Sequence, residues 1–379
     1  MTEEINPMRD LGFFPDKQVL IEPQGFMVPG NPARDLCESV IPNGAKFYDL
    51  LDRYDNVTTY VLNRTDTGHS GDVMRLIAPF LKAFGATDYS VLKFFKDGMR
   101  FNPGAEDCIR YLKALMPMYI DTVMYQHAAD DICDKLDLND CLAGASSLDL
   151  DHSEMTKKEA RDLRKMAESI VKLKLPKTQY DLNVPLELSG EEVKLVTALD
   201  DVFINKFQST EAQKMIGEMS SVGANEKAYS LLDIRKTTQI DLDGTMYVGG
   251  ESIDFQVMDL IKDGNGLALS FNGTEFAVHG ANVMVLSEDC TVAAFLGSVF
   301  YDTGIQGVFD LAESWSRDYL RNNDFPDNNL RNAVLAAPGK FPEVYRITRS
   351  NVDQLAERSE NYRTKLEKLR RMRSAKAEN

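Results

Sequence analysis

The fold is decided by the stretch Thr245-Met-Tyr-Val-Gly-Gly-Glu-Ser-Ile-Asp254-Phe-Gln-Val-Met-Asp, in which an apolar strand runs through a glycine turn into a helix. A second apolar strand follows at Leu267-Ala-Leu-Ser-Phe-Asn272-Gly, and a third at Ala281-Asn-Val-Met-Val-Leu286. Strands that alternate with helices are typical of a parallel sheet with crossover connections. The stretch therefore predicts an α/β fold with a parallel sheet.

The alternation extends toward the amino end of the chain. A first apolar strand is predicted at residues 17–22. Apolar positions at helical spacing then predict a compact block of helices over residues 31–100, and a further strand is predicted at 116–122. From about 146 to 215 the pattern is helical again, and a Thr-x-x-Glu capping box begins its first, basic helix. We interpret 146–215 as a helical insertion between sheet elements.

Composition excludes several classes of protein. The 379 residues carry a net charge of −16, which opposes nucleic acid as a partner. No apolar run approaches the roughly 20 residues of a membrane helix, and the first residues lack the pattern of a signal peptide, so we expect a cytoplasmic protein without membrane insertion. The five cysteines are scattered without a Cys-x-x-Cys pair, which argues against a disulfide framework or a zinc site.

The carboxyl end of the chain reverses this charge. Residues 363–376 contain seven Lys or Arg residues and one acid, and the apolar residues Leu355, Tyr362, Leu366 and Leu369 fall at 7-4-3 spacing. We therefore expect the C-terminal helix at 352–376 to contact a protein partner. The alternative is a solvated helix without a partner.

The strand and turn segments, together with three others, resemble a known family. The other segments are Ile41-Pro-Asn-Gly-Ala-Lys-Phe-Tyr-Asp-Leu-Leu-Asp-Arg-Tyr-Asp55, Leu76-Ile-Ala-Pro-Phe-Leu81 and Asn102-Pro-Gly-Ala105. The chain resembles the haloacid dehalogenase-like (HAD) superfamily, in particular an archaeal branch related to energy-converting hydrogenase A subunit R. The resemblance implies a Rossmann-like core with a helical cap inserted after the first strand, and a Mg²⁺-dependent phosphohydrolase ancestry.

The resemblance also implies how the chain divides into parts. It places the cap at residues 31–100, and the sheet elements of the core lie on both sides of it in the sequence. The remaining residues form a helical extension with the basic tail. The expected boundaries are 14–30 and 101–310 for the core with its insertion 146–215, 31–100 for the cap, and 311–379 for the C-terminal helical extension.

Active members of this superfamily use a nucleophilic Asp and a second Asp, two residues later, as general acid and base. At the end of the first strand this chain has Glu22 and Gln24 in those two places. A Glu carboxylate reaches one methylene further than Asp, and an amide cannot transfer a proton. The positions that bind phosphate in the family correspond to Thr122, at the end of a strand, and Lys227, in a Gly-x-x-x-Lys helix start.

The metal turn is altered too. Gly250 stands where the family has its first metal-binding Asp, and Asp254 keeps the second place. Glu251, one residue after that place, is the candidate for a second ligand; the alternative is that both acids cap the helix that follows. Because the family's Asp residues are replaced at 22, 24 and 250, the site lacks oxygen ligands that Mg²⁺ requires. We expect Mg²⁺ binding to be weak or lost.

A second acidic motif, Asp241-Leu-Asp243-Gly-Thr245, matches the nucleophile string of the family by its letters alone. It precedes its apolar strand instead of ending one, so we interpret it as a turn. The resulting hypothesis is a HAD-like protein with a degenerate phosphatase site, acting as a binding or accessory protein toward a small phosphorylated ligand or a protein partner. The alternative is an active Mg²⁺-dependent phosphohydrolase of a small phosphomonoester that uses Glu22 or the Asp241 and Asp243 pair.

Overall fold

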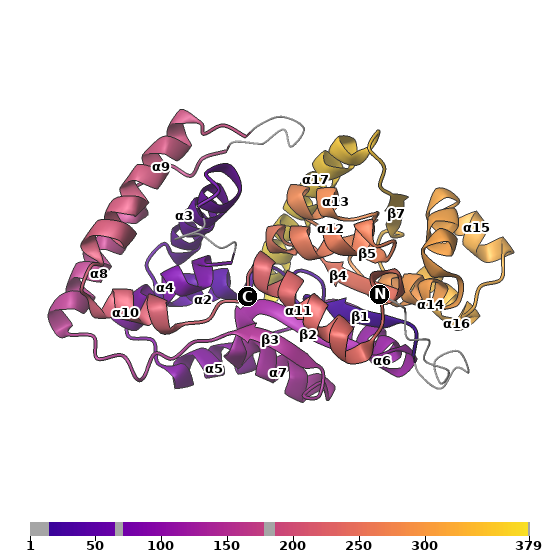
Figure 1. The fold of residues 1–379 in the computed structure, drawn as a ribbon, viewed down its shortest axis with the longest axis horizontal. Helices are drawn as coiled ribbons and strands as arrows, with labels where there is room; N and C mark the ends of the chain where they lie inside the picture. Colours follow the sequence, from indigo (N-terminus) through magenta and orange to yellow (C-terminus); the bar gives the residue numbers. More distant parts are fainter. Residues whose placement is uncertain (1–14, 65–70, 178–185, 378–379) are drawn as a thin grey trace, which may run out of the picture.

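The computed structural model describes residues 15–64, 71–177 and 186–377, with side chains described to residue 370. The described residues form one seven-stranded sheet, in which the strands lie in the order β3-β2-β1-β4-β5-β6-β7 (Figure 1). The strands are β1 Gln18–Ile21, β2 Met118–Tyr125, β3 Leu142–Ser146, β4 Thr245–Gly249, β5 Leu267–Phe271, β6 Val283–Leu286 and β7 Glu343–Arg346.

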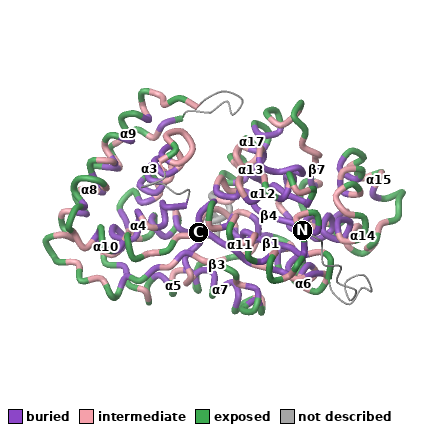
Figure 2. Tube along the Cα trace, viewed as in Figure 1, coloured by how far each residue is buried: buried purple, intermediate pink, exposed green. Residues whose placement is uncertain are grey.

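Strands β1 to β6 run parallel, and β7 pairs antiparallel with β6. The central strands are buried along their whole length, as expected for a parallel sheet that is covered on both faces. In Figure 2 these strands are drawn as buried, whereas exposed residues gather on outlying helices.

Alternate residues of each strand face two different helical layers. Val19 and Ile21 face a hydrophobic cluster that includes residues of α6 and α14, whereas Leu20 and Tyr247 face a cluster with α11 and α12. The helices of the core are α6 Ala105–Leu115, α7 Gln126–Leu136, α11 Ala224–Thr238, α12 Phe255–Asp263, α13 Glu275–Gly280 and α14 Thr291–Glu313, with 3₁₀ turns η3 Leu242–Gly244 and η4 Ser252–Asp254.

A second body of helices lies beside the sheet, at the left of Figure 1. It combines two segments far apart in the sequence, because α8 and α10 contact α4, and α9 contacts α3. Aromatic rings join the two segments: the centroids of Phe80 and Phe207 are 5.9 Å apart. Its helices are α2 Pro32–Val40, α3 Gly44–Asn56, α4 Val73–Ala83, α8 Lys157–Ile170, α9 Gly190–Asp200 and α10 Glu211–Glu218, with π-helical turns η1 Val57–Val61 and η2 Asp201–Lys206.

The fold class predicted from the sequence, an α/β fold with a Rossmann-like parallel sheet and an inserted helical cap, is confirmed. The insertion 146–215 lies between β3 and β4 in the sequence, but its helices pack on the cap helices α3 and α4. The last helix of the 31–100 block, α5 Asp88–Gly98, packs instead on α7 of the core.

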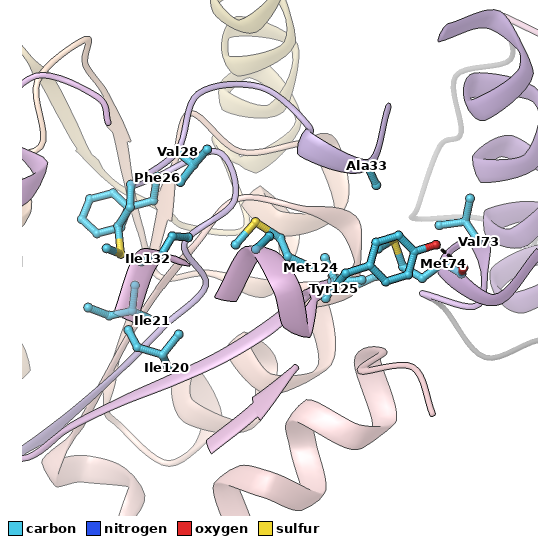
Figure 3. Close-up of a cluster of buried hydrophobic side chains, with 14 of the residues drawn as sticks. Ile21, Phe26, Val28, Ala33, Val73, Met74, Ile120, Met124, Tyr125 and Ile132 are labelled. Carbon is cyan, nitrogen blue, oxygen red and sulfur yellow. Dashed lines mark hydrogen bonds between the residues drawn. The ribbon is translucent and has the colours of Figure 1, made fainter. Parts of the chain in front are cut away.

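Cap and core also meet directly where β2 ends. The hydroxyl of Tyr125, the last residue of β2, donates a 2.6 Å hydrogen bond to the carbonyl oxygen of Met74 in α4. Figure 3 shows this ring reaching from the sheet toward the cap, next to Met124. The contact is fully buried, so the cap is fixed to the sheet edge at this point.

The C-terminal extension contains one strand that the sequence analysis does not predict, β7, which adds an edge to the sheet. It also contains the helices α15 Arg317–Asn322, α16 Asn328–Ala336 and α17 Val352–Ala377. Part of the apolar stripe of α17 is used internally, since Leu355 packs with β6 residues and Leu366 is 7% exposed, whereas Leu369 is 43% exposed. Side chains of the tail beyond residue 370 lie outside the described residues.

By length and composition, α14 passes the test for a helix that could cross a membrane. More than half of its apolar window, 56%, is nevertheless buried inside the protein, where α14 packs against α6 and β4. A buried core helix of a globular protein has these same properties.

Candidate functional site

Four of the residues singled out from the sequence come together at the carboxyl edge of the sheet. Glu22 directly follows β1, Thr122 lies in the second half of β2, and Asp254 ends the turn after β4. Lys227 lies in the first turn of α11 and points to the same place. Carboxyl ends of parallel strands share one edge, and this is where ligand sites of open α/β sheets lie.

The Glu22 carboxylate is fully buried and both of its oxygens are engaged. Its Oε1 accepts hydrogen bonds from the Gln24 amide at 2.9 Å and from the Thr122 hydroxyl at 2.6 Å. Its Oε2 accepts from the Val123 amide at 3.0 Å and from Lys227 Nζ at 2.6 Å. Each oxygen therefore has two donors, which is the number that its lone pairs accommodate.

The ammonium group of Lys227 is equally occupied. Besides Glu22, it donates to Asp254 Oδ1 at 2.7 Å and to the Tyr247 hydroxyl at 3.2 Å. These three bonds use all three of its protons. Burial lowers the pKa of Lys227, but the carboxylates of Asp254 and Glu22 outweigh burial and hold that pKa well above its ordinary value. Lys227 is a permanent cation in the interior.

Asp254 completes the cluster from the turn after β4. Its Oδ1 accepts from Lys227 and, at 2.7 Å, from the Tyr247 hydroxyl. Its Oδ2 accepts from the backbone amides of Gly250 and Glu251, both at 2.8 Å. Like Glu22 and Lys227, this side chain is completely buried. The three charged groups thus form an internally satisfied network, which we call the buried ion cluster (Glu22, Lys227 and Asp254).

The guanidinium of a distant arginine binds the turn after β4, which is the metal turn of the sequence analysis (residues 250–254). Arg363 of α17 ion-pairs with Glu251 at 3.3 Å and donates to the carbonyl oxygen of Asn272 at 2.9 Å. A further, longer bond of 3.4 Å reaches the carbonyl oxygen of Gly250. Burial raises the pKa of Glu251, and Arg363 opposes that rise. The guanidinium therefore neutralises the one extra carboxylate of this turn.

These residues do not fit the Mg²⁺ that the sequence resemblance implies. Position 250 has no carboxylate, and a Cβ placed there would lie 2.6 Å from the carbonyl oxygen of Phe271, so an Asp does not fit without a backbone shift. Both oxygens of Asp254 are engaged, and Glu251 is paired with Arg363. Within residues 15–64, 71–177 and 186–377, no group of three or more His, Cys, Asp or Glu side chains could hold a metal ion.

One acid beside the cluster lacks a full set of partners. Asp121 of β2 is 2% exposed, and its Oδ2 atom has no hydrogen-bond partner. Burial raises the pKa of Asp121 to about 6, although nearby Lys227 lowers it. The group is therefore partly protonated near neutral pH, whereas a surface Asp is fully ionised.

The second acidic motif lies at the opposite edge of the sheet. Asp241 and Asp243 precede β4 and are exposed, and Arg235 Nε donates to Asp241 at 2.9 Å. Because β1 and β4 pair in parallel from Gln18 and Thr245 onward, the start of β4 is the edge farthest from Glu22. The pair is therefore a helix-to-strand turn, separated from the buried ion cluster by the length of the strand.

A cavity of about 1000 Å³ opens between the cap and the carboxyl edge of the sheet. The core contributes Gln24 and Gly25 from the turn after Glu22, and the cap contributes polar residues of α2 and α3, including Asp52. The third wall is α17, with Arg363 and Arg370. Burial and the neighbouring Glu251 carboxylate raise the pKa of Asp52 to about 7. This volume suits a small organic ligand.

Sequence reasoning missed three residues at this site. Tyr247 lies within an apolar strand, and strand alternation could have placed it on the same sheet face as Leu20. Arg363 and Arg370 belong to the tail that the sequence analysis assigns to an external partner. No local signal shows that α17 folds back over the sheet.

Comparisons with known proteins bear on the fold. No protein-family model and no curated protein matches the sequence. Among solved structures, gene product AF1437 from Archaeoglobus fulgidus covers 93% of this chain and 96% of its own, at a TM-score of 0.74 and 21% identity. Phosphoserine phosphatase in apo form covers 72% of this chain and 95% of its own, at a TM-score of 0.38 and 15% identity. A phospho-aspartyl intermediate analogue of phosphoserine phosphatase covers 73% and 95%, at 0.42 and 13%. The similarity to the archaeal gene product extends across cap and core and concerns the fold alone.

Proposed function

We propose that this chain is a cytoplasmic HAD-like protein that has lost phosphatase chemistry and works as a binding or accessory protein. The observation that carries the proposal is that the charged groups of the buried ion cluster already have all their hydrogen-bond partners within the protein. A working site needs a carboxylate oxygen free to attack phosphorus and a cation free to hold the phosphoryl oxygens. Here Glu22 and Lys227 are each other's partners, and both are fully buried.

The energy needed to open this cluster supports the same conclusion. Separating a buried ion pair leaves uncompensated charges and costs on the order of 3–5 kcal/mol. A phosphomonoester would bring further negative charge toward two carboxylates without a metal ion to offset it. Gln24, in the acid–base position, also cannot deliver a proton to a leaving group. We therefore assign the cluster a structural role and the neighbouring cavity the binding role.

The C-terminal helix remains a proposed protein contact. Its inward face is occupied by the protein itself, through Leu355, Arg363 and Leu366. A partner would meet the opposite face, where Lys365 and Lys368 are exposed. This surface is basic, so an acidic partner surface would complement it.

Phosphate release from a broad panel of phosphomonoesters, with and without Mg²⁺, tests the loss of chemistry. Wild type, Glu22→Ala, Lys227→Ala and Asp241→Ala are compared, with Gln24→Ala as a milder change and circular dichroism as the check that each variant is folded. We expect background rates throughout. Mg²⁺-dependent release that Glu22→Ala abolishes would instead establish an active phosphohydrolase with an unusual nucleophile. Release that is lost only in Asp241→Ala would assign activity to the exposed pair.

A further inference from the structure

One wall of the cavity carries a cation, Arg370, that forms no ion pair with any described residue. Arg363, Leu366 and Arg370 all line the cavity, and their spacing of three and four residues places them on one face of α17. Arg370 is partly buried, and among the described residues it forms no ion pair. Its Nη2 donates to Asn102 Oδ1 at 3.0 Å.

The neutral partner of Arg370 is itself held in place. Asn102 is 7% exposed, and its Nδ2 donates to the carbonyl oxygen of Phe26 at 2.7 Å. The amide is thereby oriented with its oxygen toward Arg370. The bond to Asn102 uses one of the five N–H donors of the guanidinium and fixes the position of the group at the cavity wall.

Two other cavity arginines are already neutralised by carboxylates. Arg34 forms two hydrogen bonds to Asp49, at 2.6 and 2.9 Å, and Arg363 pairs with Glu251. Burial, followed by repulsion from Arg363, lowers the pKa of Arg370 below its ordinary value, although the carboxylates of Glu367 and Glu288 act in the opposite direction without forming an ion pair with it. A partly desolvated cation next to a second cation is unfavourable unless an anion accompanies it.

We propose that Arg370 binds the carboxylate group of a small ligand that occupies this cavity. The inference rests on the proposed function, because it requires a cavity that binds a ligand without hydrolysing it. It places the anion on the C-terminal helix, away from Thr122 and Lys227, whose donors are consumed in the buried ion cluster.

The charge balance of the cavity decides between carboxylate and phosphate. Seven Asp or Glu residues line the cavity against four Arg residues, so the walls are negative as a whole. A carboxylate adds one negative charge, which Arg370 alone can neutralise through paired N–H···O bonds. A phosphate monoester brings about 1.5 to 2 negative charges at pH 7. Arg100, the fourth cavity arginine, also forms no ion pair, but it is exposed and donates to the carbonyl oxygens of Asp97 and Met99. Because Arg370 is the partly buried guanidinium without an ion pair, the monovalent group is favoured.

Thermal unfolding of the full chain in the presence of small anions tests this inference. The probes are the common amino acids, hydroxy acids and dicarboxylates, with inorganic phosphate as the competing chemistry. Arg370→Met removes the cation and keeps an apolar chain of similar length. Lys368→Met is the matched control, because it removes an exposed cation of the same helix that does not line the cavity. Arg370→Lys keeps the charge but loses the planar fork.

We expect at least one carboxylate to raise the melting temperature of wild type and of Lys368→Met. Its apparent Kd should weaken about tenfold or more in Arg370→Met, and by less in Arg370→Lys. The inference is overturned if no carboxylate stabilises wild type, if inorganic phosphate stabilises it better, or if Arg370→Met retains full binding. Phosphate release measured on the same preparation separates the two proposals. Turnover refutes the loss of chemistry, whereas absent turnover without carboxylate binding refutes this inference alone.

Discussion

Replacing Lys227 with Met tests how much the buried ion cluster stabilises the folded protein. The side chain is fully buried, and its ammonium lies 2.6 Å from Glu22 Oε2 and 2.7 Å from Asp254 Oδ1. Met fills most of the volume but leaves both carboxylates in the interior without a cation. Removing one partner of a buried ion pair costs on the order of 3–5 kcal/mol. Because two carboxylates share this cation, we expect a loss at the upper end of that range.

A loss of this size is a large part of the roughly 5–15 kcal/mol that stabilises a typical domain. Urea unfolding followed by circular dichroism measures it, with Lys236→Met as the control, since Lys236 is an exposed lysine of the same helix. Adding Glu22→Gln to Lys227→Met removes one of the unpaired charges and should recover about 1–3 kcal/mol. A loss below about 1 kcal/mol, or a double variant that is no more stable than Lys227→Met, would refute the reasoning.

Three further predictions follow from single residues. Asp121 has a folded pKa near 6, above its ordinary 3.8. Its contribution to the free energy of unfolding is therefore present below about pH 4 and is lost as pH rises through 6. Urea unfolding should show wild type losing on the order of 2 kcal/mol more than Asp121→Asn between pH 4 and pH 7. Asp241→Asn changes an exposed acid, so its unfolding free energy should stay within about 0.5 kcal/mol of wild type. Gly250→Ala brings a Cβ to 2.6 Å from a backbone oxygen. It should reduce the free energy of unfolding by about 1–3 kcal/mol, which a lower melting temperature would show. Equal stability of Gly250→Ala and wild type would contradict the conclusion that the turn after β4 has no room for a side chain at position 250.

Much of the fold follows from local patterns in the sequence. The strands β1, β4, β5 and β6 are short apolar runs bounded by turns, and helical spacing marks the segments between them. Parallel pairing then puts the ends of β1 and β4 at one edge, which is why Glu22 and Asp254 could be expected to meet. The β7 edge strand has too little apolar length to be distinguished from a loop.

The rest depends on packing between distant segments. The insertion 146–215 joins the cap because Phe207 packs on Phe80, and no periodicity shows that two such rings meet. Arg363 reaches Gly250, 113 residues earlier in the chain, only because α17 folds back across β6. A run of basic residues at the end of a chain usually indicates a solvated surface, so its inward-facing arginines could not be predicted.

The most direct test of the central claim is a crystal structure of the protein grown with Mn²⁺ as a Mg²⁺ substitute that scatters anomalously. The account predicts that Lys227 bridges Glu22 and Asp254, that Arg363 stays on Glu251, and that no anomalous peak appears at the carboxyl edge of the sheet. A Mn²⁺ ion coordinated by Glu22 or Asp254, with Lys227 or Arg363 displaced, would contradict it.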